Sequence, residues 1–211
     1  MPRAGDSPVR GNLPSQPATQ EVGPTVAPTI ADPGPLGLAA FALTTFVLSV
    51  FNAGILKQGE PVVLGLALAY GGGAQLLAGM WEFRKGNTFG AVAFSSYGAF
   101  WLSFWALVAF YAKDSTPKAI GTYLLAWTIF TAYMTVAAVR TSGAVLAVFV
   151  ALTLTFLFLA LGDLTTTSGL TKVGGWLGLL TAILAWYASF AAVTNATWRR
   201  TVLPVFPLSE R

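Results

Sequence analysis

Six stretches of this chain contain no charged residue and are long enough to cross a lipid bilayer. They are residues 36–56, 61–81, 89–112, 119–139, 143–162 and 173–198. A membrane-spanning helix needs about 20 apolar residues. Lipid offers the backbone no hydrogen bonds, so helices are favoured, and the stretches lack the alternating polarity of barrel strands. The sequence therefore predicts an all-α membrane protein with six transmembrane helices in one compact bundle.

Composition supports this fold class and narrows the function. Only 9% of the residues are charged and 55% are hydrophobic, whereas soluble domains carry about 25% charged residues. The net charge of +4 is scattered between the apolar stretches, which does not indicate a nucleic-acid partner. The chain has no cysteine and no histidine, the residues behind most thiolate metal sites and general bases. We expect no metal, no cofactor and no enzymatic activity.

The apolar stretches also define the domain organisation. Residues 1–31 are rich in Pro, Ser, Thr and Gly and lack the apolar segment of a signal peptide, so we expect a disordered tail that is retained. Residues 32–204 form the expected six-helix domain, and residues 205–211 a short C-terminal tail. The connections are short, which predicts that consecutive helices are antiparallel neighbours.

The distribution of Lys and Arg predicts the orientation. Eight of the twelve fall on the side of the two termini and four on the other. The first group is Arg3, Arg10, Arg84, Lys85, Arg140, Arg199, Arg200 and Arg211, and the second is Lys57, Lys113, Lys118 and Lys172. Because positive loops stay in the cytoplasm, we expect a multi-pass protein of the plasma or bacterial inner membrane with both termini cytoplasmic.

The first stretch carries polar residues on one helical face. This face comprises Leu38, Phe41, Thr45, Ser49 and Asn52, at a spacing of three and four residues, with Thr44 beside them. The hydroxyl groups can bond to the carbonyls of their own helix, so one interpretation is that lipid simply tolerates these residues and that they have no further role. Asn52 is costlier to leave unpaired, and we expect it to bond a neighbouring helix or to line water.

The second stretch has the same spacing at Gly72, Gln75, Gly79 and Glu82. Small residues let membrane helices approach closely, so the glycines favour packing. Gln75 lies in mid-span and needs partners or water. Glu82, with Arg84 and Lys85 beside it, is expected to form an interfacial ion pair, and a role in gating or proton transfer is the alternative.

Three further features lie in the later stretches. Tyr97, Trp101 and Trp105 form an aromatic stripe, which faces lipid or forms a pore constriction. Asp163 follows the fifth stretch and is expected at the interface, capping the next turn. The sixth stretch has small residues at helical spacing, which favour a helix-packing face. They are Gly175, Gly178, Ala182, Ala185, Ser189, Ala192 and Ala196.

Several motifs together resemble a known family. The segment Asp32-Pro33-Gly34-Pro35-Leu36-Gly37-Leu38 is similar to the Asn-Pro-Ala-Pro-Leu-Gly-Leu signature of the acetate uptake transporters, the succinate–acetate permeases. Further matches, in order, cover residues 70–72, 74–75, 78–79, 82, 85–90, 94, 96–98, 100–101, 175–176, 178 and 200–204. The resemblance spans roughly residues 32–204.

This resemblance implies a hexamer with one pore per protomer, which conducts acetate and related monocarboxylates and also succinate. It implies a constriction of Phe41, Tyr97 and Leu152, and a specificity position at Ala185. The entrance motif is Asp32, Pro33, Pro35 and Gly37. In this motif Asp32 replaces the family's Asn, and an ionised Asp32 facing the entry would repel an anion unless it caps the first helix.

The residues suggest how such a pore would work. Carboxylate passage needs donors without negative charge, which the hydroxyls of Thr44, Thr45 and Ser96 and the amides of Asn52 and Gln75 provide. Glu82 and Asp163 are the candidates for gating or proton coupling. The partners are then small carboxylates, the bilayer and a second copy of the chain. The alternative is a membrane scaffold or sensor that binds a ligand without transporting it.

Overall fold

The computed structural model describes residues 30–209, and within them the predicted six spans are present. The disordered-tail prediction for residues 1–31 falls almost wholly outside the described residues, as does the end of the predicted C-terminal tail. The spans are Gly34–Asn52, Val62–Lys85, Thr88–Asp114, Pro117–Ala138, Gly143–Thr165 and Ser168–Trp198. Each is long and apolar enough to cross a membrane. The all-α, six-helix prediction is confirmed.

Two of the six spans comprise several helical segments, and the others are single helices. The first span is α1 (Gly34–Asn52). The second consists of α2 (Val62–Leu68), a π-helical turn η1 (Ala69–Ala74) and α3 (Gln75–Lys85). The third consists of α4 (Thr88–Ala106), a π-helical turn η2 (Leu107–Tyr111) and a 3₁₀ turn η3 (Ala112–Asp114). The last three spans are α5 (Pro117–Ala138), α6 (Gly143–Thr165) and α7 (Ser168–Trp198).

Local signals set the helix ends. Thr116 and Ser142 precede α5 and α6, and each hydroxyl accepts a hydrogen bond from a first-turn backbone N–H. Gly86 ends α3 with φ +81°. The first charge-free stretch runs to residue 56, but α1 stops at Asn52 because the chain turns at Gly54 with φ +75°. The other helices extend past the charge-free stretches, since helix formation does not require the absence of charge.

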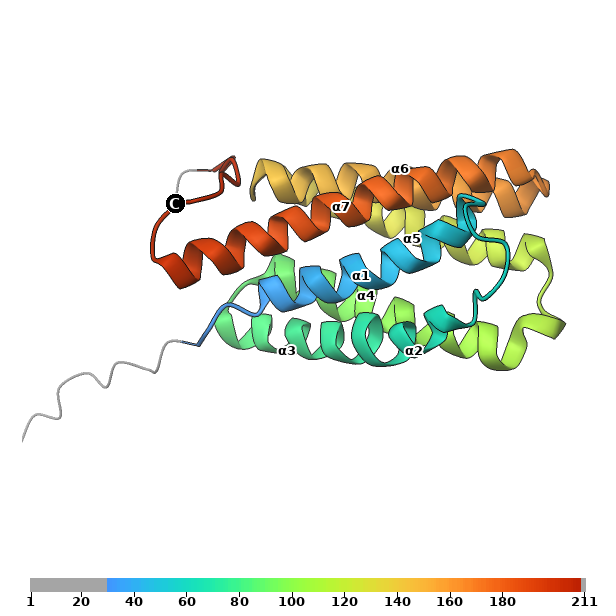
Figure 1. Ribbon diagram of the computed structural model, residues 1–211, viewed down its shortest axis with the longest axis horizontal. Helices are drawn as coiled ribbons and strands as arrows, with labels where there is room; N and C mark the ends of the chain where they lie inside the picture. Colours follow the sequence, from blue (N-terminus) through green and yellow to red (C-terminus); the bar gives the residue numbers. More distant parts are fainter. Residues whose placement is uncertain (1–29, 210–211) are drawn as a thin grey trace, which may run out of the picture.

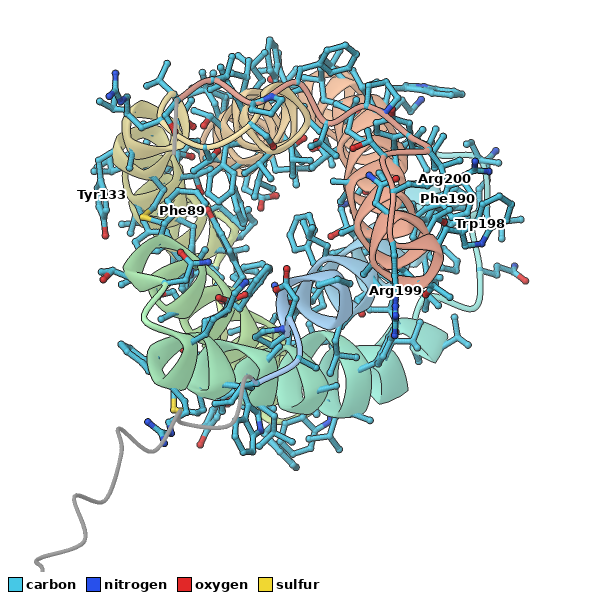
Figure 2. All side chains as sticks on the ribbon, turned by 90° about the vertical axis from the view of Figure 1, so that its left-hand side faces the viewer. Phe89, Tyr133, Phe190, Trp198, Arg199 and Arg200 are labelled. Atoms are coloured by element: carbon cyan, nitrogen blue, oxygen red, sulfur yellow. The ribbon has the colours of Figure 1, made fainter. Side chains whose placement is uncertain are left out.

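The spans run along the long axis of the molecule (Figure 1). The described ends of the chain lie at one end of the bundle, which we call the termini side, together with the α3–α4 and α5–α6 connections. Seen from the termini side, the helices surround a central space (Figure 2). Tyr133, Phe190 and Trp198 point away from this space and are more than half exposed. Such an apolar outer face fits a lipid environment.

The first and last spans are close neighbours, which the short connections did not predict. Helix α1 packs along α7, whereas the consecutive helices α4 and α5 approach each other far less. Two glycines on α7 allow this contact: a Cβ on Gly175 would overlap the backbone of Ala53, and a Cβ on Gly178 would overlap the Ser49 hydroxyl. The expected helix-packing face of the last stretch is therefore present, and its partner is α1.

This close contact predicts a stability difference among glycine variants. Replacing Gly175 with Ala should lower the thermal unfolding midpoint in detergent, because the added methyl group forces α1 and α7 apart at a cost of about 1–3 kcal/mol. Gly65→Ala and Gly169→Ala are matched controls, since a Cβ there would meet nothing within 4 Å. Those two variants should match or exceed the wild-type midpoint, and a Gly175→Ala midpoint equal to theirs contradicts the packing account.

Candidate transport pathway

One face of α1 forms a wall of the central space. Phe41, Thr45, Leu48, Ser49 and Asn52 all line the same cavity. Their spacing of three and four residues places them on one side of the helix. The sequence predicted this face, and the contact with α7 fixes its direction.

The cavity has a volume of about 260 Å³ and extends from the middle of the bundle to the side opposite the termini. Helices α4, α5, α6 and α7 form the remaining walls with the turns around residues 107–112, and Glu60 contributes from the loop before α2. Apolar side chains dominate these walls. They include Phe100, Trp101, Phe104, Leu124, Leu152 and Phe156. Such a cavity suits a small solute that is partly apolar.

An aromatic cluster lies at the inner end of the cavity. The ring centroids of Phe41 and Tyr97 are 5.8 Å apart, those of Tyr97 and Phe149 are 6.0 Å apart, and those of Phe149 and Phe89 are 5.1 Å apart. Tyr97 and Phe149 are buried and lie about one helical turn nearer the termini side than the cavity residues Trp101 and Leu152. The cluster therefore lies between the cavity and the termini side.

The three expected constriction residues come together at this level. Phe41 and Leu152 line the cavity, and Tyr97 packs behind Phe41. The Tyr97 hydroxyl donates to Thr131 Oγ1 at 2.9 Å, and Thr131 donates in turn to the carbonyl of Trp127. This chain of hydrogen bonds holds the Tyr97 ring in place.

The expected polar lining divides into two groups. Thr45 and Asn52 line the cavity, together with Ser49, Thr155 and Thr171. Thr45 is 6% exposed, and its hydroxyl has no hydrogen-bond partner within the described part of the chain. A buried hydroxyl without a partner is costly, and Thr45 is a cavity-lining residue that carries this cost.

Thr44, Gln75 and Ser96 are not among the cavity-lining residues. Thr44 is buried and donates to the carbonyl of Ala40 at 2.9 Å, against Gly71 of η1. Gln75 is also buried, and its side-chain oxygen has no partner among residues 30–209. For Thr44, bonding within its own helix was the alternative that the sequence left open.

The entrance motif anchors the start of α1. Asp32 accepts a hydrogen bond from Gly34 N at 2.9 Å and forms an ion pair with Lys85 at 2.7 Å. Pro33 is buried, and the Pro35 carbonyl accepts a hydrogen bond from Ser189 of α7 at 2.7 Å. Gly37 lies directly against the Phe94 ring. Lys85 thus compensates the negative charge that replaces the family's amide.

Glu82 belongs to the same cluster on the termini side. It is only 1% exposed, accepts a hydrogen bond from Asn87 at 2.8 Å and lies 3.9 Å from Lys85 Nζ. The sequence predicted an ion pair with Arg84 or Lys85, and within residues 30–209 only Lys85 approaches Glu82 to ion-pair distance. Asn87 is the additional partner, and it also caps α4 by accepting from Gly90 N.

Of the two remaining expected site residues, Asp163 lines the cavity and Ala185 does not. Asp163 is in the last turn of α6 and lines the cavity near its opening, together with Glu60. Ala185 is fully buried in the core of α7 and is not among the cavity-lining residues. Within the described range, no three acidic side chains gather as a metal site would require.

Sequence reasoning missed some pathway residues. Phe149 and Phe89 help to close the cavity, and Thr155 and Glu60 line it. Phe149 lies in a uniformly apolar stretch, where no periodicity distinguishes an interior from a lipid-facing side chain. Thr155 was visible as a hydroxyl in mid-span, but a hydroxyl there can simply bond its own helix, as Thr155 does to the Ala151 carbonyl.

Known proteins are similar to this chain in sequence and in fold. The model of the GPR1/FUN34/yaaH family matches residues 15–210. The chain is 45% identical to Accumulation of dyads protein 2 of Saccharomyces cerevisiae over 188 residues, which cover 84% of this chain and 66% of the yeast protein. It is 37% identical to the succinate-acetate/proton symporter SatP of Escherichia coli over 83% of this chain and 95% of SatP.

A solved structure shows the same arrangement. The bacterial acetate channel SatP superimposes with a TM-score of 0.81 at 35% sequence identity, covering 84% of this chain and 99% of that one. The chain spans about two thirds of the length of the yeast relative, but nearly all of the bacterial one. The family match over most of the sequence agrees with the motif resemblance, and the chain belongs to the GPR1/FUN34/yaaH family.

Proposed function

We propose that this protein is a membrane transporter or channel for acetate and related short-chain carboxylates, with succinate as a further substrate. The observation that carries this proposal is the cavity of about 260 Å³ whose inner part holds Phe41, Leu152 and the unpaired hydroxyl of Thr45. The names of the relatives support it, since they include a succinate-acetate/proton symporter and an acetate channel.

The residues around the cavity suggest how a carboxylate would pass. The hydroxyl of Thr45 and the amide of Asn52 are donors for the carboxylate oxygens, and the rings of Phe41 and Tyr97 with Leu152 accommodate the methyl group. No lysine or arginine is among the described residues that line the cavity, so binding is weak and exchange is fast. An apolar constriction can also gate a pore by excluding water.

Glu82 and Asp163 are the candidates for proton coupling or gating. Glu82 is a buried carboxylate at the start of the pathway on the termini side, linked through Lys85 to Asp32 of the entrance motif. Asp163 is at the cavity opening on the opposite side. We also propose that the functional unit is a homo-oligomer, a hexamer with one pathway per protomer, as the resemblance implies.

The proposed orientation places the termini side in the cytoplasm. Arg84, Lys85, Arg140, Arg199 and Arg200 lie on that side, which supports this orientation. Residues 32–204 then form the transport domain between a cytoplasmic N-terminal tail and a short C-terminal tail. A reporter fused after Arg211 should be active in the cytoplasm, and a clear extracytoplasmic signal would reverse the orientation.

Transport is tested directly with purified protein in liposomes. Radiolabelled acetate should enter faster than into empty vesicles, which correct for passive diffusion of the protonated acid. An imposed pH gradient that accelerates uptake indicates a proton symporter, and uptake that follows the acetate gradient alone indicates a channel. Entry equal to that of empty vesicles favours the alternative function, a ligand-binding scaffold or sensor.

Substrate size is expected to depend on Leu152. Leu152→Ala should raise the ratio of lactate to acetate uptake severalfold, because it removes about three carbons of apolar wall beside Phe41. Leu179→Ala is the matched control, since Leu179 is also buried but is not among the cavity-lining residues. Ala185→Ser is also expected to alter this ratio, because the family resemblance assigns substrate size to this position, but by less than Leu152→Ala, since Ala185 does not itself line the cavity. Ratios that stay unchanged in both the Leu152 and Ala185 variants argue against this pore assignment.

A further inference from the structure

The opening of the cavity carries only negative charge. Among the described residues that line the cavity, Glu60 and Asp163 are charged, and both are acidic. Glu60 lies on the loop between α1 and α2, and Asp163 lies in the last turn of α6. Both are on the side opposite the termini, where the cavity opens. This is unexpected in a pathway for carboxylates, since charges of like sign repel.

No basic residue compensates these carboxylates within residues 30–209. The Asp163 and Glu60 side chains have no cation within 4.0 Å and accept no hydrogen bond there. Four lysines lie on the same side of the bundle. They are Lys57, Lys113, Lys118 and Lys172, and all are exposed. The stem of Lys172 lies against Gly54, and none of the four lysines is among the cavity-lining residues. Within residues 30–209, no ion pair neutralises the two carboxylates at the opening.

The ligand contacts inside the cavity are of a different kind. Thr45, nine-tenths buried and without a hydrogen-bond partner for its hydroxyl among residues 30–209, lines the inner part of the cavity. Asn52 lies between this level and the opening, at the end of α1. A carboxylate thus passes acidic charges first and then meets uncharged donors.

From this arrangement we propose that Asp163 and Glu60 form a charge filter, which favours singly charged carboxylates over doubly charged dicarboxylates. Coulomb repulsion grows in proportion to the charge of the solute, and apolar walls focus the field of the two carboxylates into the cavity. The expected discrimination against a dianion relative to a monoanion is on the order of tenfold. The inference rests on the proposed transport function and assigns Asp163 and Glu60 as specificity residues.

The test compares acetate with succinate at neutral to mildly alkaline pH, where succinate is doubly charged. Asp163→Asn, Glu60→Gln and the double variant are purified into liposomes, and uptake of both labelled acids is measured at low and high ionic strength. The succinate-to-acetate ratio should rise severalfold in Asp163→Asn and most in the double variant. The wild-type ratio should rise with salt, because ions screen the repulsion, and the ratio of the double variant should stay constant.

Two controls separate charge from structure. Asp114→Asn removes the same charge on the same side, from an exposed residue that is not among the cavity-lining ones, and should leave the ratio unchanged. Asp163→Glu retains the charge and should keep the wild-type ratio. If Asp163→Asn does not fold, Glu60→Gln and the salt dependence of the wild type decide the question.

The experiment distinguishes failure of the charge filter from failure of the proposed transport function. Wild-type acetate uptake equal to that of empty vesicles would contradict the proposed function. A different outcome is that the wild type takes up acetate clearly, while its succinate-to-acetate ratio depends neither on salt nor on these two carboxylates. That result would overturn the charge filter and leave the transport proposal intact.

Discussion

The close contact between α1 and α7 determines the geometry of the interior. Gly175 and Gly178 leave room for the backbone of Ala53 and for the side chain of Ser49, so the first and last spans approach closely at these two positions. Ser189 of α7 secures the other end of α1 by donating to the Pro35 carbonyl. Because α1 is held along its length, the face with Phe41, Thr45 and Asn52 is directed into the bundle.

Side-chain packing closes the ring of helices where backbones lie farther apart. Between α4 and α5, the contacts are made by large side chains: Tyr97 bonds to Thr131, and Phe100 packs edge-on against Trp127. The same aromatic residues extend to Phe41 and Phe149, which close the inner end of the cavity. One set of rings thus holds the helices together and lies at the inner end of the cavity. If this level is the constriction, the stability of the bundle and the closure of the proposed pathway depend on the same contacts.

The sequence predicted the spans well because their signal is global: a bilayer requires long apolar helices. The ends were less predictable, since α1 stops at a turn that depends on the positive φ of Gly54. Side-chain roles were predicted in part. Thr45 and Asn52 line the cavity, but Thr44, one residue away, faces η1. Phe149 gave no signal, because a uniformly apolar stretch does not distinguish lipid from interior. Long-range pairs such as Asp32 with Lys85 depend on the three-dimensional arrangement.

The central claim is that the cavity is a pathway open on one side and closed at Phe41 and Tyr97. The chain has no cysteine, so a single Thr45→Cys variant provides a specific probe. In oriented vesicles, a membrane-impermeant thiol reagent should label this cysteine only from the side opposite the termini, and acetate should slow the labelling. Equal labelling from both sides, or labelling that acetate does not affect, would contradict the account.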